Sequence, residues 1–356
     1  MKKYTIFLML FLLQAMKCEA APNKIKIGVS VPLSGDAASY GNDIKNSLLF
    51  ANKELSDNNY ELVFEDDRCD GKQSASIAHK FVSNKVRYVL GFACSGSLLS
   101  SAPIYEKNKI IVISAGASSP TVSTAGDFIF RTAPSDVSSL AVLVDYLVAH
   151  HKKITFLADE SDYSEGMVKG VQSFAGEKLS INVERFLPTE SDFNSLLLRI
   201  KSANPEALML VTQAEGKLAD IAKAIRVLNW SIHVYGAYFP GSPSFLNTAG
   251  EAANGIKYLD APLVSEVASS KGLELYQKFI SEYGTPKSIP YFFVTAYNSF
   301  DALDLAIKSG KDVKNTLYEL KVDGITGTFY FDHNGDVMGL KNVMKIIEGG
   351  KPKLLG

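Results

Sequence analysis

The sequence predicts an α/β fold with two doubly wound lobes, each built on a parallel sheet. β-branched runs alternate with helical patterns along most of the 356 residues, as expected where helices connect parallel strands. The alternation starts a second time at Ser138, which indicates a second domain of the same type. The composition, 46% hydrophobic and 21% charged residues, is typical of a globular chain with a large buried core.

The first third of the chain consists of repeated strand–helix units. Strands are predicted over the β-branched runs at residues 24–31, 60–65, 87–92 and 109–114. The helix after the first strand places Ile44, Leu48 and Leu55 on one apolar stripe, which predicts a face packed on the sheet. A second helix is predicted around Ile77 and Phe81.

The second half repeats this pattern and then changes. Helices are predicted at residues 138–150, 163–177, 196–200 and 218–228, with strands at 154–158, 180–186, 207–211 and 233–237. After Pro262 the pattern is helical, with an apolar face from Phe293 to Ile307. Strands at 327–332 and 343–348, around a turn at 332–335, close the chain. No long Gly/Ser linker separates the lobes, so we expect several short crossovers and a cleft that closes.

The N-terminal segment has the three parts of a secretory signal peptide. Lys2 and Lys3 precede an apolar stretch, and Cys18 and Ala20 provide small side chains before a cut that we predict after Ala20. Lys17 stands where a lipoprotein signal needs a small residue, which disfavours lipid attachment to Cys18. A buried N-terminal helix is the other alternative. The pattern predicts residues 1–20 as signal peptide and an exported mature protein.

Export changes the charge and the cysteine count. The mature chain keeps 34 basic and 37 acidic residues, so no basic excess favours a nucleic-acid partner. Two cysteines, Cys69 and Cys94, remain in an oxidising compartment, which makes them a candidate disulfide. Two separately buried thiols are the alternative.

Motifs of known chemistry are absent from the sequence. It contains no G-x-G-x-x-G, Walker A, G-x-S-x-G, H-E-x-x-H or C-x-x-C pattern. We interpret the adjacent His150 and His151 as a solvated helix end rather than a metal site. We interpret Asp66, Asp67 and Asp70 as a turn beside the disulfide, because a calcium loop needs ligands at alternating positions. No cofactor or metal is expected.

Two loops of small residues follow the third and fourth strands. They are GFACSGS at residues 91–97 and SAGASSP at 114–120. The carboxyl ends of parallel strands form the edge where open α/β sheets bind ligands, because backbone NH groups and helix N-termini converge there on anions. Ser95 and Ser118 add hydroxyls at this edge. Either loop alone is an ordinary capped turn, but together they favour a ligand site.

The chain resembles the periplasmic branched-chain amino-acid binding proteins, the solute receptors of ABC importers. The resemblance runs from about Lys24 to Gly350 and rests on four segments, PLSG (32–35) before YG (40–41), FEDDRCD (64–70), CSGS (94–97) and DESDYSEG (159–166). It implies a type I periplasmic binding fold with three crossovers, a disulfide between the two cysteines, no enzymatic activity and a membrane permease as partner. We expect a monomer.

The resemblance also implies lobe boundaries and site residues. We expect the first lobe to contain residues 21–138 and 262–335, and the second 139–261 and 336–356. Ser95, Gly116 and Ser118 match the positions that hold a ligand's carboxylate and ammonium. Tyr40 matches an aromatic wall of the side-chain pocket, Tyr163 matches a residue of second-lobe closure, and Phe292 matches an aromatic position late in the family's sequences.

Two positions depart from the family pattern and limit the prediction of the ligand. Tyr238 stands where amino-acid binders place a glutamate for the ammonium, and a phenol carries no full negative charge. The stretch 212–215 has a small residue where a cleft tyrosine is usual. Either Glu215 or Asp159 then faces the ammonium, or the ligand has none.

Three functions stay open at this point. A receptor for an aliphatic, branched-chain type amino acid is favoured over a receptor for another organic acid or an amide. A ligand sensor coupled to a membrane partner is the third. An enzyme with Ser95 as nucleophile is disfavoured, because no histidine lies near either loop in the sequence.

Overall fold

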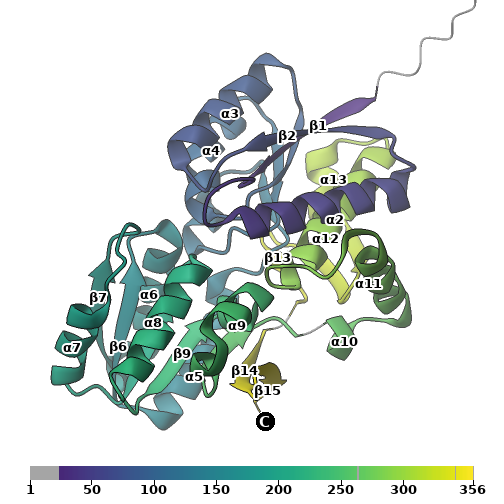
Figure 1. The fold of residues 1–356 in the computed structure, drawn as a ribbon. Helices are drawn as coiled ribbons and strands as arrows, with labels where there is room; N and C mark the ends of the chain where they lie inside the picture. The colour runs from purple at the N-terminus through teal and green to yellow at the C-terminus, as the bar shows by residue number, and fades with distance from the viewer. Residues whose placement is uncertain (1–23, 263, 341, 356) are drawn as a thin grey trace, which may run out of the picture.

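A computed structural model describes residues 24–262, 264–340 and 342–355. Two lobes, each with its own sheet, face one another, and the chain passes between them more than once (Figure 1). The predicted signal peptide at residues 1–20 lies outside the described residues.

The first lobe is built on a five-stranded parallel sheet. The strand order is β2-β1-β3-β4-β5, with every pairing parallel. Its N-terminal elements are β1 (Ile25–Val31), α2 (Ala38–Ser56), β2 (Tyr60–Asp66), α3 (Gly71–Ser83), β3 (Tyr88–Gly91), α4 (Ser95–Lys107), β4 (Ile111–Ser114), the short 3-10 helix η1 (Pro120–Thr124) and β5 (Ile129–Arg131). The four predicted strands of this region are confirmed, and β5 is an additional one.

Alternate side chains of this sheet enter two separate apolar layers, because successive residues of a strand point to opposite faces. Val89 and Val112 pack with the α3 residue Phe81 in one layer. Leu90 and Ile113 pack with the α2 residue Leu48 in the other. The sheet is therefore covered by helices on both faces, as the doubly wound prediction requires.

The second lobe repeats the architecture. Its elements are α5 (Asp136–His150), β6 (Lys153–Asp159), α6 (Asp162–Ala175), η2 (Gly176–Lys178), β7 (Ser180–Phe186), α7 (Asn194–Ser202), β8 (Ala207–Val211), α8 (Glu215–Val227), β9 (His233–Ala237), η3 (Phe239–Gly241), α9 (Pro243–Ala249), η4 (Gly250–Ala253) and β10 (Lys257–Asp260). The sheet order is β15-β14-β10-β9-β8-β6-β7, and the strands β6 to β10 pair in parallel.

The chain then returns to the first lobe and crosses a third time. The remaining elements are α10 (Val264–Val267), α11 (Ser270–Tyr283), α12 (Tyr291–Lys308), α13 (Val313–Glu319), β11 (Lys321–Gly324), β12 (Gly327–Phe331), β13 (Val337–Met338), β14 (Val343–Glu348) and β15 (Lys351–Leu354). Helix α12 lies along α2 (Figure 1). Crossovers therefore follow β5, β10 and β13.

The prediction for the end of the chain is wrong in its pairing. The turn at 332–335 connects β12 to β13 in a small antiparallel sheet, whereas β14 pairs with β10 of the second lobe. Periodicity shows that a strand exists but does not identify a partner far away in the chain. Because β13 pairs with β12, the chain leaves the first-lobe sheets after Met338, whereas the expected boundary was residue 335. At the first crossover, α5 of the second lobe begins at Asp136.

The interpretation of His151 as solvated is also wrong. Its side chain is buried, and its Nε2 lies 2.8 Å from the Tyr235 hydroxyl. Burial lowers the pKa of His151, which favours the neutral ring. Among the described residues no group of histidine, cysteine and acidic side chains is arranged to hold a metal ion.

Cys69 and Cys94 form a disulfide, as predicted, with their Cα atoms 5.5 Å apart. The Asp66–Asp70 turn beside it is confirmed as well. Asp67 accepts from the Ser30 hydroxyl at 2.9 Å, and Asp70 accepts from the Gln73 NH at 2.7 Å to cap α3. The disulfide therefore anchors the start of α4 to the end of the neighbouring β2 segment.

Loss of this disulfide is expected to destabilise the protein. The bond closes a separation of 25 residues, so replacing both cysteines with serine should lower the free energy of unfolding by about 3 kcal/mol in the loop-entropy model. Urea unfolding measures this change, and thiol titration of the denatured wild-type protein should find no free thiol. Two free thiols, or unchanged stability in the double variant, would contradict the bond.

Candidate functional site

The first half of the site is the carboxyl edge of the first-lobe sheet. Gly91 at the end of β3 has a φ of +113°, and a Cβ there would lie 2.4 Å from the Ser30 carbonyl oxygen, so only glycine fits this turn. The chain then enters α4 at Ser95, which is 1% exposed. Ser95 Oγ accepts from the Ser119 NH at 3.2 Å. The two predicted small-residue loops are therefore joined at this serine.

The second loop needs its glycine for the same steric reason. A Cβ on Gly116 would lie 2.7 Å from the Ala93 carbonyl oxygen and 2.8 Å from the Phe292 ring. Arg131 is fully buried and forms hydrogen bonds with this loop. Its Nη1 donates to the Ser119 carbonyl at 2.9 Å, and its Nε to Asp336 at 2.6 Å. Sequence reasoning did not identify Arg131, because a lone arginine at the end of a short strand has no distinguishing pattern.

Aromatic rings from both lobes meet next to these loops. Tyr40 of α2 and Phe292 of α12 lie with ring centroids 5.4 Å apart in the first lobe. Phe239, at the end of the second-lobe strand β9, stacks on Tyr40 at 5.5 Å. Tyr163 of α6 packs edge-on against Phe239 at 5.8 Å. Phe239 was not predicted, because the departure from the family pattern at the neighbouring Tyr238 concerns an acid and not an aromatic ring.

The lobes also touch at the N-terminus of α6. A Cβ on Gly166 would lie 2.8 Å from Ser119 Oγ, and one on Gly96 would lie 2.9 Å from Asp162 Oδ2. The Tyr40 hydroxyl donates to the Gln213 carbonyl at 2.5 Å across the cleft. Ser95, Tyr40 and Tyr163 are consequently buried although they lie at lobe surfaces. The structure thus has the two lobes closed on one another.

Four buried side-chain atoms of the second lobe have no hydrogen-bond partner among the described residues, namely the hydroxyls of Thr155, Tyr163 and Tyr258 and Glu215 Oε1. Two of these residues lie beside the aromatic rings of the site, Tyr163 against Phe239 and Glu215 near Tyr40. Glu215 begins α8 and faces Tyr40. Burial raises the pKa of Glu215 to about 7, and the nearby hydroxyls of Ser242, Ser244 and Tyr40 act in the opposite direction. Unpaired buried polar groups cost free energy, which makes them candidates for contact with a ligand.

Asp159 has a different environment from Glu215. Its carboxylate accepts from the hydroxyls of Ser161, Ser164 and Thr212 at 2.6, 2.5 and 2.6 Å. It also accepts from the Gln213 NH at 3.3 Å. All four donors belong to the second lobe, so the role of Asp159 in the structure is to hold the loops at the ends of β6 and β8.

A third acid, Asp136, lies at the junction of the lobes and was not predicted. It is fully buried at the start of α5. Asp136 accepts from the Ser118 hydroxyl at 3.1 Å and from the Tyr238 hydroxyl at 3.3 Å. Burial raises the pKa of Asp136 to about 7, while Arg131, Ser118 and Tyr238 lower it. In the sequence it is only the first residue of a helix after a serine cap.

Tyr238 is held in place on several sides. Its φ of 59° puts a bulky residue in the left-handed region, which local energetics disfavour. Asn342 Nδ2 donates to its hydroxyl at 3.1 Å, and its ring stacks on Tyr291 with centroids 6.2 Å apart. These contacts direct the phenol at Asp136 instead of leaving it free in the cleft.

The structure brings the predicted residues together. Ser95, Gly116, Ser118, Tyr40 and Phe292 come from the first lobe, and Tyr163, Tyr238 and Glu215 from the second. Ser95 Oγ accepts from a backbone NH and has no role as an activated nucleophile in this arrangement. Hydroxyls, acids and aromatic rings from two lobes therefore meet at one interface, an arrangement typical of proteins that bind a small molecule between their lobes.

Residues 24–351 match the family model described as periplasmic binding protein, so the chain belongs to this family, whose members bind solutes and are not enzymes. It is 26% identical over 339 residues to the Leu/Ile/Val-binding protein of Escherichia coli K12, covering 90% of each chain. It is 28% identical to the leucine-, isoleucine-, valine-, threonine- and alanine-binding protein of Pseudomonas aeruginosa, covering 89% of this chain and 88% of the relative.

Solved structures confirm the type I fold. A leucine binding protein from Thermotoga maritima superposes with a TM-score of 0.86 at 21% identity, covering 93% of this chain and 98% of the other. A solute binding protein from R. palustris in complex with benzoate has a TM-score of 0.82 at 21% identity, covering 94% and 96%. In the part of the chain that the structure describes, no helix is long and apolar enough to cross a membrane.

Proposed function

We propose that the chain is the periplasmic receptor of an ABC importer and captures an aliphatic amino acid by closing its two lobes. The observation that carries this proposal is Asp136, a buried acid in contact with both Ser118 and Tyr238. Asp136 supplies a carboxylate beside Tyr238, which stands at the position where a glutamate is expected. Similarity to Leu/Ile/Val-binding relatives over nine-tenths of the chain supports the same ligand class.

The first-lobe loops suit the carboxylate of the ligand. Ser95 stands at the N-terminus of α4, where backbone NH groups and the helix dipole favour an anion. Ser118 adds a second hydroxyl a short distance away on the joined loop. Small neighbours such as Gly116 let a ligand approach the backbone closely.

The ammonium is assigned to the corner around Asp136. An ammonium there gives the buried acid an ionic partner, which offsets the cost of its burial. Asp159 is already saturated by four donors of its own lobe, so we assign it a supporting role. Glu215 lies beside Tyr40, where it faces the side chain of the ligand. Tyr40, Phe239, Phe292 and Tyr163 then form an apolar enclosure for that side chain.

A second candidate is a receptor for an organic acid without an amine. It is favoured by Tyr238 and by the number of aromatic rings around the cleft, which suit a planar acid. Solute binding proteins with the same fold were solved with benzoate and with 3,4-dihydroxybenzoic acid. A thermal-shift panel of amino acids and aromatic acids separates the two, since a ligand at 100 times its Kd adds about 2.7 kcal/mol of stability.

Replacing Ser95 with alanine is expected to weaken binding of either acid. Losing a hydrogen bond to a charged group should cost about 1.5 to 3 kcal/mol, roughly a tenfold to hundredfold rise in Kd. Calorimetric titration with leucine measures it. Ser101→Ala is the matched control, because Ser101 is also a buried α4 serine but donates to the Ser97 carbonyl of its own helix. Equal Kd values for the Ser95 variant and this control would refute the assignment.

A further inference from the structure

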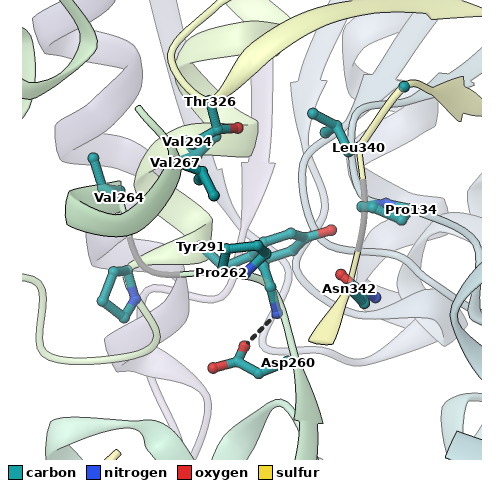
Figure 2. A pocket seen from close by; sticks show the side chains of 13 residues that line it. Pro134, Asp260, Pro262, Val264, Val267, Tyr291, Val294, Thr326, Leu340 and Asn342 are labelled. Atoms are coloured by element: carbon teal, nitrogen blue, oxygen red, sulfur yellow. Dashed lines mark hydrogen bonds between the residues drawn. The ribbon is translucent and has the colours of Figure 1, made fainter. Parts of the chain in front are cut away.

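A cavity of about 200 Å³ lies among the crossovers and is lined by Tyr291, whose ring stacks on Tyr238. All three crossovers contribute to it, through Pro134 after β5, Pro262 after β10, and Leu340 and Asn342 after β13. Figure 2 shows Tyr291 reaching across the middle of this cavity, with Leu340 and Pro134 facing it from one side. We call it the hinge cavity.

The walls of the hinge cavity are mainly apolar. Three prolines, at positions 134, 262 and 290, offer no NH donor, and Val294 and Leu340 add aliphatic surface. An apolar cavity of roughly 150 Å³ is large enough for one benzene ring. The hinge cavity therefore has the size and surface for a single small ring.

Charge at the edge of the cavity selects against an acid. Among the described residues that line it, Asp260 is the one charged group, and its ion-pair partner Lys345 is buried. Lys345 Nζ lies 3.2 Å from Asp260 and donates to the Ala261 carbonyl at 2.7 Å. A carboxylate entering the cavity would meet the negative Asp260 and, among the described lining residues, no positive charge, which favours a neutral occupant.

One polar atom of the lining, the side-chain carbonyl oxygen of Asn342, orients a bound molecule by accepting a hydrogen bond. Asn342 uses its Nδ2 to donate to Ser139 and Tyr238. Its carbonyl oxygen accepts no hydrogen bond from the residues that the structure describes, and a hydroxyl on the ring could donate to it. A neutral ring with one hydroxyl, that is a phenol, satisfies the size, the apolar walls and this acceptor together.

We propose that the hinge cavity is a second small-molecule site, selective for a neutral phenol and coupled to the cleft. The coupling follows from shared side chains. Tyr291 and Asn342 line the cavity and are the same residues that stack on and donate to Tyr238. Tyr238 in turn donates to Asp136 in the cleft. Because the walls come from all three crossovers, an occupant also braces the lobes in the arrangement seen here.

Titration of the full mature chain with phenol tests the site. We expect one molecule to bind with a Kd of about 1 mM or tighter, as suits a ligand of this size. Thr326→Phe and Leu340→Trp place bulk at two half-buried positions of the lining and should each weaken phenol binding by about tenfold or more. Leu354→Trp, at an exposed position on β15, is the matched control and should leave it unchanged.

Two further measurements separate this site from the cleft, and a third tests the coupling between them. Phenol binding should survive in Ser95→Ala, and benzoate should not compete with phenol for the hinge cavity. Loss of phenol binding in Ser95→Ala, or its persistence in both bulky variants, would overturn the site. Saturating phenol should change the Kd of leucine by about fivefold or more. An unchanged Kd of leucine would overturn the coupling. Of these measurements, only this one rests on the proposed function.

Discussion

Asp136→Asn is expected to weaken leucine binding by a factor of about 30 or more, because a charged ammonium without its partner costs about 2 kcal/mol or more. Ser118 and Tyr238 donate to different oxygens of Asp136, so in the asparagine variant one hydroxyl keeps its acceptor and the other must turn to accept from the new amide NH2. Isothermal titration calorimetry of the two proteins with leucine measures the change.

Two other variants make this result specific. Asp304→Asn alters an equally buried acid on α12 that accepts from Tyr60 at 2.8 Å, and it should leave leucine affinity unchanged. Glu215→Gln tests the second cleft acid, and we expect a smaller loss because Glu215 faces the side-chain end of the ligand. If Asp136→Asn binds leucine as tightly as Asp304→Asn does, the ammonium is not held at Asp136.

The raised pKa of Asp136, about 7, gives leucine binding a pH dependence. The ammonium favours the ionised carboxylate, so binding releases a proton when the free protein is protonated. Affinity should therefore fall as the pH drops below about 7, by up to tenfold per pH unit, and level off above it. The pKa of Glu215 lies in the same range, so the pH dependence of leucine affinity is measured in the Glu215→Gln variant. A slope that persists when Asp136→Asn is added would contradict the assignment.

Arg131→Met should lower the free energy of unfolding by about 3 to 5 kcal/mol, since it leaves Asp336 without its buried partner. The guanidinium is fully buried. It donates to the Ala117 and Ser119 carbonyls, the Ser123 hydroxyl and Asp336, and so connects the predicted ligand loop to the turn between β12 and β13. Urea unfolding gives the stability, and leucine titration shows whether the loop still binds.

A double variant supplies the control for Arg131. Arg131→Met combined with Asp336→Asn removes both charges and should recover part of the lost stability. A single variant that loses less than about 1 kcal/mol would show that the buried pair does not stabilise the fold.

The fold was predictable because its signals are local. Alternation of β-branched runs with apolar helical stripes predicted most strands of both sheets but not β5, β10 or β15, and small residues predicted a ligand edge. Long-range pairing was not predictable in the same way. The run at 343–348 has the pattern of a strand, but only tertiary structure shows that it joins β10 and not β12.

The site was predictable where it follows strand ends and less so elsewhere. Ser95, Gly116 and Ser118 lie at carboxyl ends of β3 and β4, where sheet topology concentrates ligand contacts. Asp136, by contrast, reaches the cleft from the helix that follows a crossover, and no spacing in the sequence connects it with Tyr238, 102 residues away. The position of Asp136 next to Tyr238 depends on how the two lobes are joined. Hydrophobic periodicity carries no information about that arrangement.

The amino-acid assignment is tested most directly by comparing leucine with isocaproate, its deaminated analogue, on the wild-type protein. Calorimetric titration of both at neutral pH gives two dissociation constants under one set of conditions. With Asp136 facing an ammonium, leucine should bind about 30 times more tightly or better. Isocaproate binding as tightly as leucine, or more tightly, would contradict the amino-acid assignment and leave a receptor for an organic acid.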